Sequence, residues 1–151
     1  MTFSPDRTVR MVELTMSADQ AVSTTAATAV AFDTLRGDAG HGVGLSSSAV
    51  TLTAGRDYMI QAMGAITISS AGAVTWRWYN TATSSYLTAA QGAGDGSHSA
   101  TYAVSVQDQS ESMLATLTLC PGVDTTLEFH VAGKTGTLRS SGSRMVILEA
   151  K

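Results

Sequence analysis

The residues best suited to chemistry in this sequence are three histidines, His41, His98 and His130. They form no His-x-His, His-Glu-x-x-His or Cys/His cluster, so no familiar metal-ligand spacing is present. The first two lie in glycine-rich segments. The third follows Phe129 in an alternating run, where we expect it to face solvent or a subunit interface. The histidine pattern therefore predicts no metal site.

Nucleophiles lack a supporting signature as well. The sequence holds no Gly-x-Ser-x-Gly elbow, and the segments GLSSS and GSHSA are predicted to be turns. A catalytic triad can still be assembled from residues distant in sequence. With three histidines and no signature, we nevertheless predict that the protein is not an enzyme. The lone cysteine, Cys120, forms no internal disulfide, and at the end of the apolar run LATLTLC we expect it to be buried and inert.

The twelve acidic residues are spread singly, mostly in segments expected to be turns. Asp33, Asp38 and Asp95 lie in loops that could attract calcium, but no ligand run of the EF-hand kind is present. The glycine-rich segment QGAGDGSH is not followed by a helix that would supply N–H groups to a phosphate. We therefore expect no cofactor.

One short motif suggests another class of function. The segment TLRGDAGHGVG contains Arg36-Gly37-Asp38, the tripeptide that matrix proteins present to integrins. We expect it in an exposed loop, in which Gly37, Gly40, Gly42 and Gly44 adopt positive φ angles. The sequence shows neither a signal peptide nor a cysteine pair, and this disfavours an extracellular adhesion protein.

The amino-acid composition limits the kinds of partner that this protein can bind. The 151 residues suffice for one domain with its own core. Only 14% of them are charged, against about 25% in ordinary folded chains, so Ser, Thr, Gly and Ala must cover much of the surface. Such a surface suits packing against copies of the same chain or a large neighbour, although β-rich folds use these residues in any case. The net charge of −3 without a basic patch predicts no nucleic-acid partner, and the absence of a long apolar stretch predicts no membrane partner.

The hydrophobic pattern has a period of two, which is typical of half-buried antiparallel strands. The segments YMIQAMGAITIS, AVTWRWYN, MLATLTL and TLEFHVAG alternate in this way between turn clusters such as TAGRD and CPGVD. The last run, RMVILEA, is apolar without a break. It predicts a central strand that is covered on its outer side by another strand or subunit. The pattern predicts an all-β fold with little helix.

The segments ADQAVSTTAATAVAFDT, VTLTAGRDYMIQAMG and LTLCPGVDTTLEFHV occur in this order. Together they resemble the jelly-roll domain shared by tumour necrosis factor and the complement globular head. ADQAVSTTAATAVAFDT is similar to the opening of bacterial and phage members, with a Gln-containing stretch before a strand that ends in Phe-Asp-Thr. VTLTAGRDYMIQAMG resembles the family's strand, Ala-Gly, Tyr and long-strand element. LTLCPGVDTTLEFHV resembles its late hairpin, although Val123 interrupts the usual adjacent Gly-Asp. The resemblance covers about Thr8 to Ala150 and implies a two-sheet antiparallel jelly-roll sandwich that forms a homotrimer.

The resemblance also implies where subunits meet and what the protein does. Family trimers place aromatic residues near the threefold axis, and the family's last strand lies near the subunit interface. The candidates for the trimer interface are therefore Trp76, Trp78 and Tyr79, together with Met145 and Ile147 of the last strand. Two functions remain open, a capsid decoration (cement) protein on the outside of a phage head and a receptor- or carbohydrate-binding tip of a tail fibre.

The sequence shows no heptads or collagen-like repeat for a fibre shaft, and this favours the cement protein. We expect residues 1–7 to be an N-terminal arm and residues 8–151 to be the jelly-roll domain. The arm's contacts with the major capsid protein would come from Thr2, Phe3, Ser4, Pro5, Asp6 and Arg7. Such a protein is made in the host bacterial cytoplasm and then resides on the capsid exterior of the virion.

Overall fold

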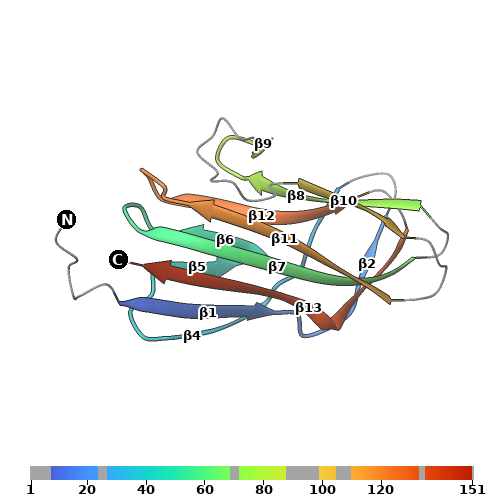
Figure 1. The fold of residues 1–151 in the computed structure, drawn as a ribbon, viewed down its shortest axis with the longest axis horizontal. Coiled ribbons are helices and arrows are strands. Elements are labelled where there is room, and N and C mark those ends of the chain that lie inside the picture. Colours follow the sequence, from blue (N-terminus) through green and yellow to red (C-terminus); the bar gives the residue numbers. More distant parts are fainter. Residues whose placement is uncertain are drawn as a thin grey trace.

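The computed structural model describes residues 8–23, 27–68, 72–87, 99–104, 110–132 and 135–150. Their regular elements are all strands, arranged in two antiparallel sheets (Figure 1). This confirms the predicted all-β jelly-roll sandwich. No helix in the described part of the chain is long and apolar enough to cross a membrane. The predicted N-terminal arm, residues 1–7, lies outside the described residues.

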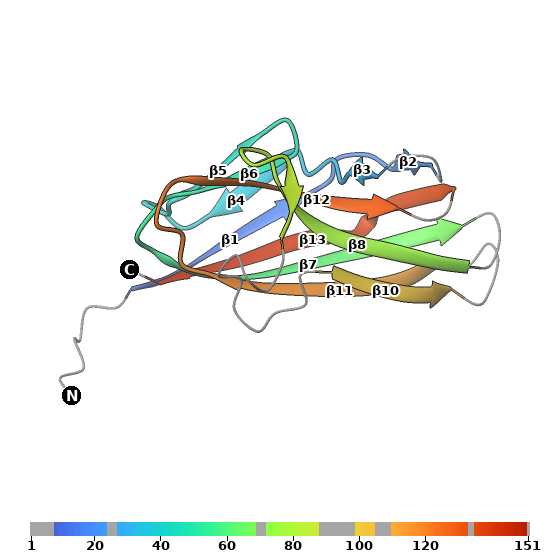
Figure 2. The ribbon, with the colours of Figure 1, turned by 90° about the horizontal axis from the view of Figure 1, so that it is seen from above.

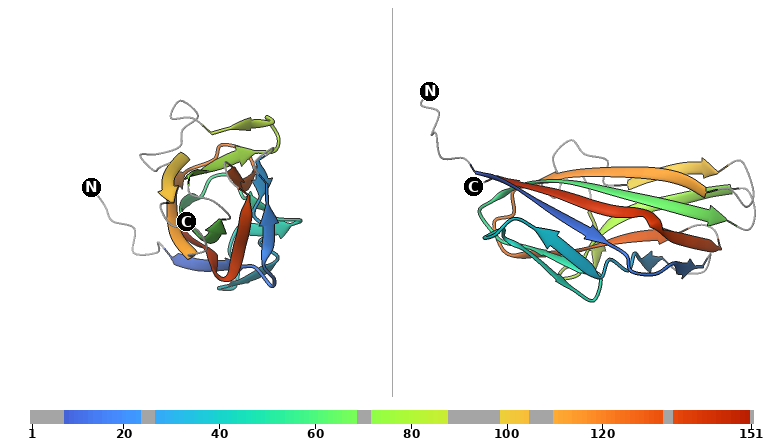
Figure 3. Two further views of the ribbon diagram at one scale, coloured as in Figure 1. Left: turned by 90° about the vertical axis from the view of Figure 1, so that its right-hand side faces the viewer. Right: turned by 90° about the horizontal axis from the view of Figure 1, so that it is seen from below.

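The two sheets are built from strands that are distant in sequence. The first sheet has the order β11 (Ser110–Leu119), β7 (Asp57–Ile68), β13 (Gly136–Ala150), β1 (Val9–Thr15) and β4 (Thr34–Gly37), with β2 (Gln20–Val22) pairing β13. The second has the order β10 (Ser99–Val104), β8 (Gly72–Asn80), β12 (Thr125–Ala132), β6 (Ala49–Leu52) and β5 (Val43–Ser46), with β3 (Thr28–Ala29) pairing β12 and β9 (Ser85–Tyr86) pairing β8. Figure 2 shows the two layers from above, and the end-on view in Figure 3 shows them facing each other.

The core lies between the sheets, where the alternating residues predicted from the sequence meet. On the second sheet, the ring of Phe129 packs against Trp76 and Trp78, with centroid separations of 5.1 and 4.7 Å. All three side chains are almost fully buried. The Trp76 indole also lies directly against the backbone of Gly64 on the opposite sheet, where a Cβ atom would come within 2.1 Å of the ring. The core therefore depends on a glycine at that point of β7.

The Phe-Asp-Thr segment does not end a strand as predicted, because residues 30–33 belong to no strand and Thr34 begins β4. Two side chains hold this segment and the Gln-containing stretch in place. The carboxamide of Gln20 donates to the carbonyl oxygen of Ala29 and accepts from the N–H of Ala31, so it bridges β2 and the segment around β3 in the other sheet. The carboxylate of Asp33 accepts hydrogen bonds from the N–H and the hydroxyl of Ser17. These bonds hold the pKa of Asp33 below its ordinary value. Gln20 therefore joins β2 to the segment around β3, and Asp33 joins the turn after β1 to the segment before β4.

The last strand is central, as predicted, because β13 lies between β7 and β1. Met145 and Ile147 point into the core, whereas Val146 and Leu148 point to the outer side of the sheet. Leu148 is 38% exposed, and no other strand of the described chain packs over it. The expected cover on the outer side is thus not supplied by the described part of this chain.

The Arg-Gly-Asp motif does not form the loop tip that the sequence suggested. Arg36 and Gly37 belong to β4 and pair with Glu13 and Val12 of β1. The Asp38 carboxylate accepts a hydrogen bond from the backbone N–H of Met11 at 2.9 Å. Of the four glycines expected to have positive φ, only Gly40 has it, at 76°. The motif lies at the edge of the first sheet, because the backbone of Arg36 and Gly37 pairs with β1.

Candidate functional site

The most unusual surface in the described chain is the outer face of the first sheet. Met11 of β1 is paired with Leu148 of β13, and Leu148 is paired with Met59 of β7, so the three side chains form one row across three strands. They are 54%, 38% and 43% exposed, in that order. Large apolar side chains at adjacent outward positions of a sheet indicate a contact surface, whereas a single exposed one would not. We call these three residues the apolar row.

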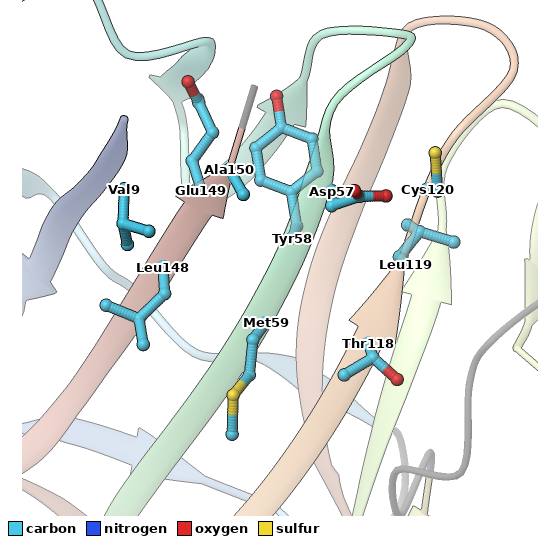
Figure 4. Close-up of a pocket in the computed structure, with 10 residues that line it drawn as sticks. All are labelled: Val9, Asp57, Tyr58, Met59, Thr118, Leu119, Cys120, Leu148, Glu149 and Ala150. Carbon is cyan, nitrogen blue, oxygen red and sulfur yellow. The ribbon is translucent and has the colours of Figure 1, made fainter. Parts of the chain in front are cut away.

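A groove adjoins this row at the end of the sheet where β1 begins and β13 ends. It has a volume of about 490 Å³, and its lining is predominantly apolar. Figure 4 shows Met59 and Leu148 on neighbouring strands and Val9 beyond them on β1. Leu119 and Cys120 line the opposite side of the groove. The row and the groove together form a continuous apolar area at one end of the sheet.

A buried charge supports the strand end beneath this groove. Glu149 is 1% exposed, and its carboxylate accepts from the N–H of Gly42 at 2.5 Å and from the guanidinium of Arg56. Arg10 lies 3.8 Å from the same carboxylate. A buried carboxylate is retained when cations and N–H groups compensate for its lost hydration. Glu149 thereby joins the end of β13 to the turn after β4.

Tyr58 completes this support. Its hydroxyl lies 3.1 Å from the carbonyl oxygens of Gly42 and Thr53. Burial raises the pKa of the phenol, and the nearby Glu149 charge raises it further. A Cβ atom on Gly42 would come within 2.8 Å of the Tyr58 oxygen. Gly42 is therefore required for close approach and not for a positive φ.

Cys120 differs from the sequence expectation because it is exposed at the rim of the groove. A hydrogen bond to the Asp57 carboxylate raises the pKa of its thiol, and Asp57 also adds an unfavourable charge. The cysteine is accessible, and its raised pKa disfavours the thiolate form.

The residues predicted for a trimer interface fall into two groups. Trp76, Trp78, Met145 and Ile147 are at most 1% exposed and fill the space between the sheets. They point inward because each occupies the core-facing phase of its strand, and no surface is left on them for a neighbouring subunit to contact. Tyr79 is partly exposed, but on the outer face of the second sheet. The structure does not bring these five residues together in one surface.

The predicted capsid contacts, residues 2–7, lie outside the described residues, as do His98 and Asp95. Nδ1 of His41 accepts a hydrogen bond from the N–H of Val43. His130 lies on the outer face of the second sheet, next to Glu128 and two tyrosines. Among the described residues, no three His, Cys, Asp or Glu side chains gather as a metal site requires.

Sequence reasoning missed the apolar row itself. Neither Met11 nor Met59 was singled out from the sequence, and Leu148 was treated only as part of the unbroken apolar run RMVILEA. The signal was nevertheless present, because Met59 alternates with Tyr58 and Ile60, and Leu148 with Ile147. Each is an apolar residue in the outward phase of a strand whose inward phase is already apolar.

The sequence matches no protein-family model and no curated protein. Solved structures with the same fold are nevertheless found. The Eiger TNF from S. frugiperda aligns with a TM-score of 0.66 and 11% identity, covering 95% of this chain and 92% of that one. Murine APRIL at pH 5.0 aligns with a TM-score of 0.68 and 8% identity, covering 94% and 99%.

A phage protein belongs to the same group of neighbours. The PRD1 vertex protein P5 aligns with a TM-score of 0.53 and 16% identity, covering 95% of each chain. At these identities the similarity shows the fold alone. The chain therefore has the jelly-roll fold of tumour-necrosis-factor-like proteins, which a phage structural protein also has.

Proposed function

We propose that this protein is a capsid decoration (cement) protein, a homotrimer that binds the outside of a phage head and stabilises contacts between major capsid subunits. The observation that carries the proposal is the apolar row with its adjoining groove. The similarity to a phage vertex protein supports the location, and the resemblance to tumour-necrosis-factor-like jelly rolls supports the trimer. No observation favours an enzymatic role for this surface, whose predominantly apolar lining suits packing.

Self-association follows from the energetics of the uncovered side chains. Burial of apolar surface contributes about 25 cal/mol for each Å² removed from water, so covering three half-exposed side chains in each subunit favours association. The row lies across the centre of the sheet, over β1, β13 and β7, where a flat partner surface can reach all three residues. We place the subunit interface here, in the outward phase of the same strands whose inward phase forms the core.

A trimer explains how a weakly charged surface can hold a capsid. Three identical contacts meet a threefold site, and after the first has engaged, the other two bind at high effective concentration. Each contact can then be small and polar, as the Ser/Thr-rich composition requires. We propose residues 2–7, which precede β1, as the segment that meets the major capsid protein.

Size measurement tests the subunit interface. Met59→Glu and Leu148→Glu should each convert the trimer to monomers in analytical ultracentrifugation, because a carboxylate cannot be buried unpaired in an apolar contact. Ala82→Glu introduces the same charge in an exposed turn of the second sheet and should leave the trimer intact. Trimers that persist in both row variants, or a wild-type monomer, would refute this interface.

Particle binding tests the function. Purified protein should bind phage heads that lack it and raise the temperature at which they release DNA, and removal of residues 2–7 should weaken binding while the trimer persists. If the purified protein instead blocks adsorption of phage to cells and does not bind heads, the fibre-tip alternative holds. Full occupancy of heads by the truncated protein would remove residues 2–7 from the contact.

A further inference from the structure

A second cluster of side chains lies on the outer face of the second sheet, away from the apolar row. Strands β8, β9 and β12 contribute Arg77, Tyr79, Tyr86, Glu128 and His130. Within it, Nε2 of His130 lies 2.7 Å from the Glu128 carboxylate, and Nδ1 lies 3.3 Å from the hydroxyl of Tyr86. The sequence predicts no triad, yet the sheet assembles a carboxylate, an imidazole and a hydroxyl in series. These residues come from segments more than forty positions apart.

We propose that Tyr86 is a nucleophilic tyrosine and a site of covalent acylation, with His130 as its general base and Glu128 as the positioning residue. A weak nucleophile becomes reactive when a base lies within hydrogen-bond reach and a third group orients the base. In the tautomer of His130 that donates from Nε2 to the Glu128 carboxylate, Nδ1 is free to accept the Tyr86 proton. The inference is independent of the proposed cement function and claims no turnover of a substrate.

The backbone fixes the position of Tyr86. The turn after β8 is closed by the side chain of Asn80, which accepts hydrogen bonds from the N–H groups of Ala82 and Thr83. This turn returns the chain as β9, so that Tyr86 pairs with Tyr79. Leu87 then donates its N–H to the carbonyl oxygen of Trp78 and anchors the segment to the core. The hydroxyl is therefore held by ladder and turn, and not by a free loop.

Two neighbouring side chains act on Tyr86 and His130, one by its charge and one by stacking. The guanidinium of Arg77 lies over the Tyr86 ring, 4.0 Å from its centroid, and favours the negative charge that builds on the phenol as its proton passes to His130. Tyr79 stacks on His130 at a centroid distance of 4.7 Å and an interplanar angle of 16°, which restrains the imidazole plane. The side chain of His130 is 12% exposed, and Tyr86 is partly exposed, so the base is sheltered while the nucleophile is reachable.

The chemical step balances with an activated acyl ester as the only co-reactant. The phenolic oxygen of Tyr86 attacks the carbonyl carbon and forms a new carbon–oxygen bond, and the bond to the leaving oxygen breaks. The phenolic proton passes to Nδ1 of His130 and then to the leaving oxygen. The products are a tyrosyl ester and an alcohol, and nothing is oxidised or reduced.

The probe is p-nitrophenyl acetate, with acetylated peptides counted by mass spectrometry after an acid quench. Tyr79 is an internal control, because it lies beside Tyr86 while none of its described hydrogen bonds reaches the imidazole nitrogens. We expect Tyr86 to be acetylated about tenfold faster than Tyr79 or more, since general-base assistance contributes about 10²–10⁴-fold in enzymes. Equal labelling of the two tyrosines would overturn the proposal.

Variants separate the chemical roles from structural ones. His130→Gln should reduce Tyr86 labelling to the rate of Tyr79, and in His130→Gly added free imidazole should restore it, which a purely structural histidine would not allow. Glu128→Gln should lower the Tyr86 rate severalfold while circular dichroism stays unchanged. Gly44→Ala lies in β5, at the other edge of the second sheet, and should leave the rate as it is. Labelling that is insensitive to His130→Gln, or acetyl found on His130 alone, would refute Tyr86 as the nucleophile.

Discussion

Replacing Gly64 by alanine tests how the core of this sandwich is assembled. A Cβ atom at this position would lie 2.1 Å from Cη2 of Trp76 and 2.8 Å from two further ring atoms. Carbon atoms in contact are normally about 3.5–4.0 Å apart, so the indole would have to move by more than about 1 Å. It has no space to do so, because Trp76 is fully buried and stacks on Phe129.

The magnitude follows from two opposing effects. Overpacking of a dense core costs about 1–3 kcal/mol and occasionally more, and a rigid aromatic ring against backbone places Gly64→Ala at the upper end. Alanine regains about 0.5–1 kcal/mol relative to glycine inside a strand. We expect a net loss of about 2–2.5 kcal/mol in the free energy of unfolding, measured by urea titration at fixed protein concentration.

A matched control and a double-mutant cycle test whether the loss of stability comes from the contact between Gly64 and Trp76. Gly44→Ala also lies in a strand, but its new Cβ meets only Thr51 Cβ at 3.7 Å, so stability should stay equal or rise by up to about 1 kcal/mol. Trp76→Phe removes the clashing ring atoms, so in the background of that substitution the cost of Gly64→Ala should fall by at least about 1 kcal/mol. Additive losses, or a Gly64→Ala variant as stable as Gly44→Ala, would refute the packing argument.

Three further predictions concern charge and titration. Glu149→Gln leaves the Arg56 guanidinium without its charge partner. Because Arg56 is partly solvated, we expect the free energy of unfolding in urea to fall by about 2–3 kcal/mol. A loss below about 0.5 kcal/mol would contradict a supporting role for Glu149. Asp33 has a folded-state pKa below its ordinary value near 3.8, so its stabilising effect is present above that value and is lost as the pH falls through the lower folded-state pKa. Asp33→Asn should therefore flatten the acid limb of the stability–pH curve, and an unchanged limb would argue against the Ser17 contact. Asp57→Asn should lower the raised pKa of the Cys120 thiol and speed its reaction with a disulfide reagent near pH 8, with unchanged kinetics as the contrary result.

The fold was predictable because its signals are local and periodic. Alternation along YMIQAMGAITIS and TLEFHVAG assigns Ile60 and Phe129 to the inward phase without any knowledge of their partners, and both are buried. The unbroken run RMVILEA likewise indicated a central strand with two apolar faces. Such patterns report which side of a strand is apolar, because side chains alternate strictly in a β-strand.

The site was less predictable because it depends on pairing between distant strands. Trp76 and Met145 were expected at a subunit interface, but inward phase combined with sheet-on-sheet packing places them in the core. Similarly, Gly37 was expected in an exposed loop, and only its pairing with Val12 reveals β4. No sequence window shows which outward residues become neighbours, since register is set by the whole sheet.

The sequence by itself therefore determined the class of fold, the phases of the strands and the central place of the last strand. Tertiary structure alone decided that Met11, Met59 and Leu148 form one row and that Glu128, His130 and Tyr86 stand in series. The physical reason is the distance along the chain between the residues that interact. Alternation arises from the geometry of a single strand, whereas a surface or a hydrogen-bonded series arises from contacts between strands that are remote in the chain.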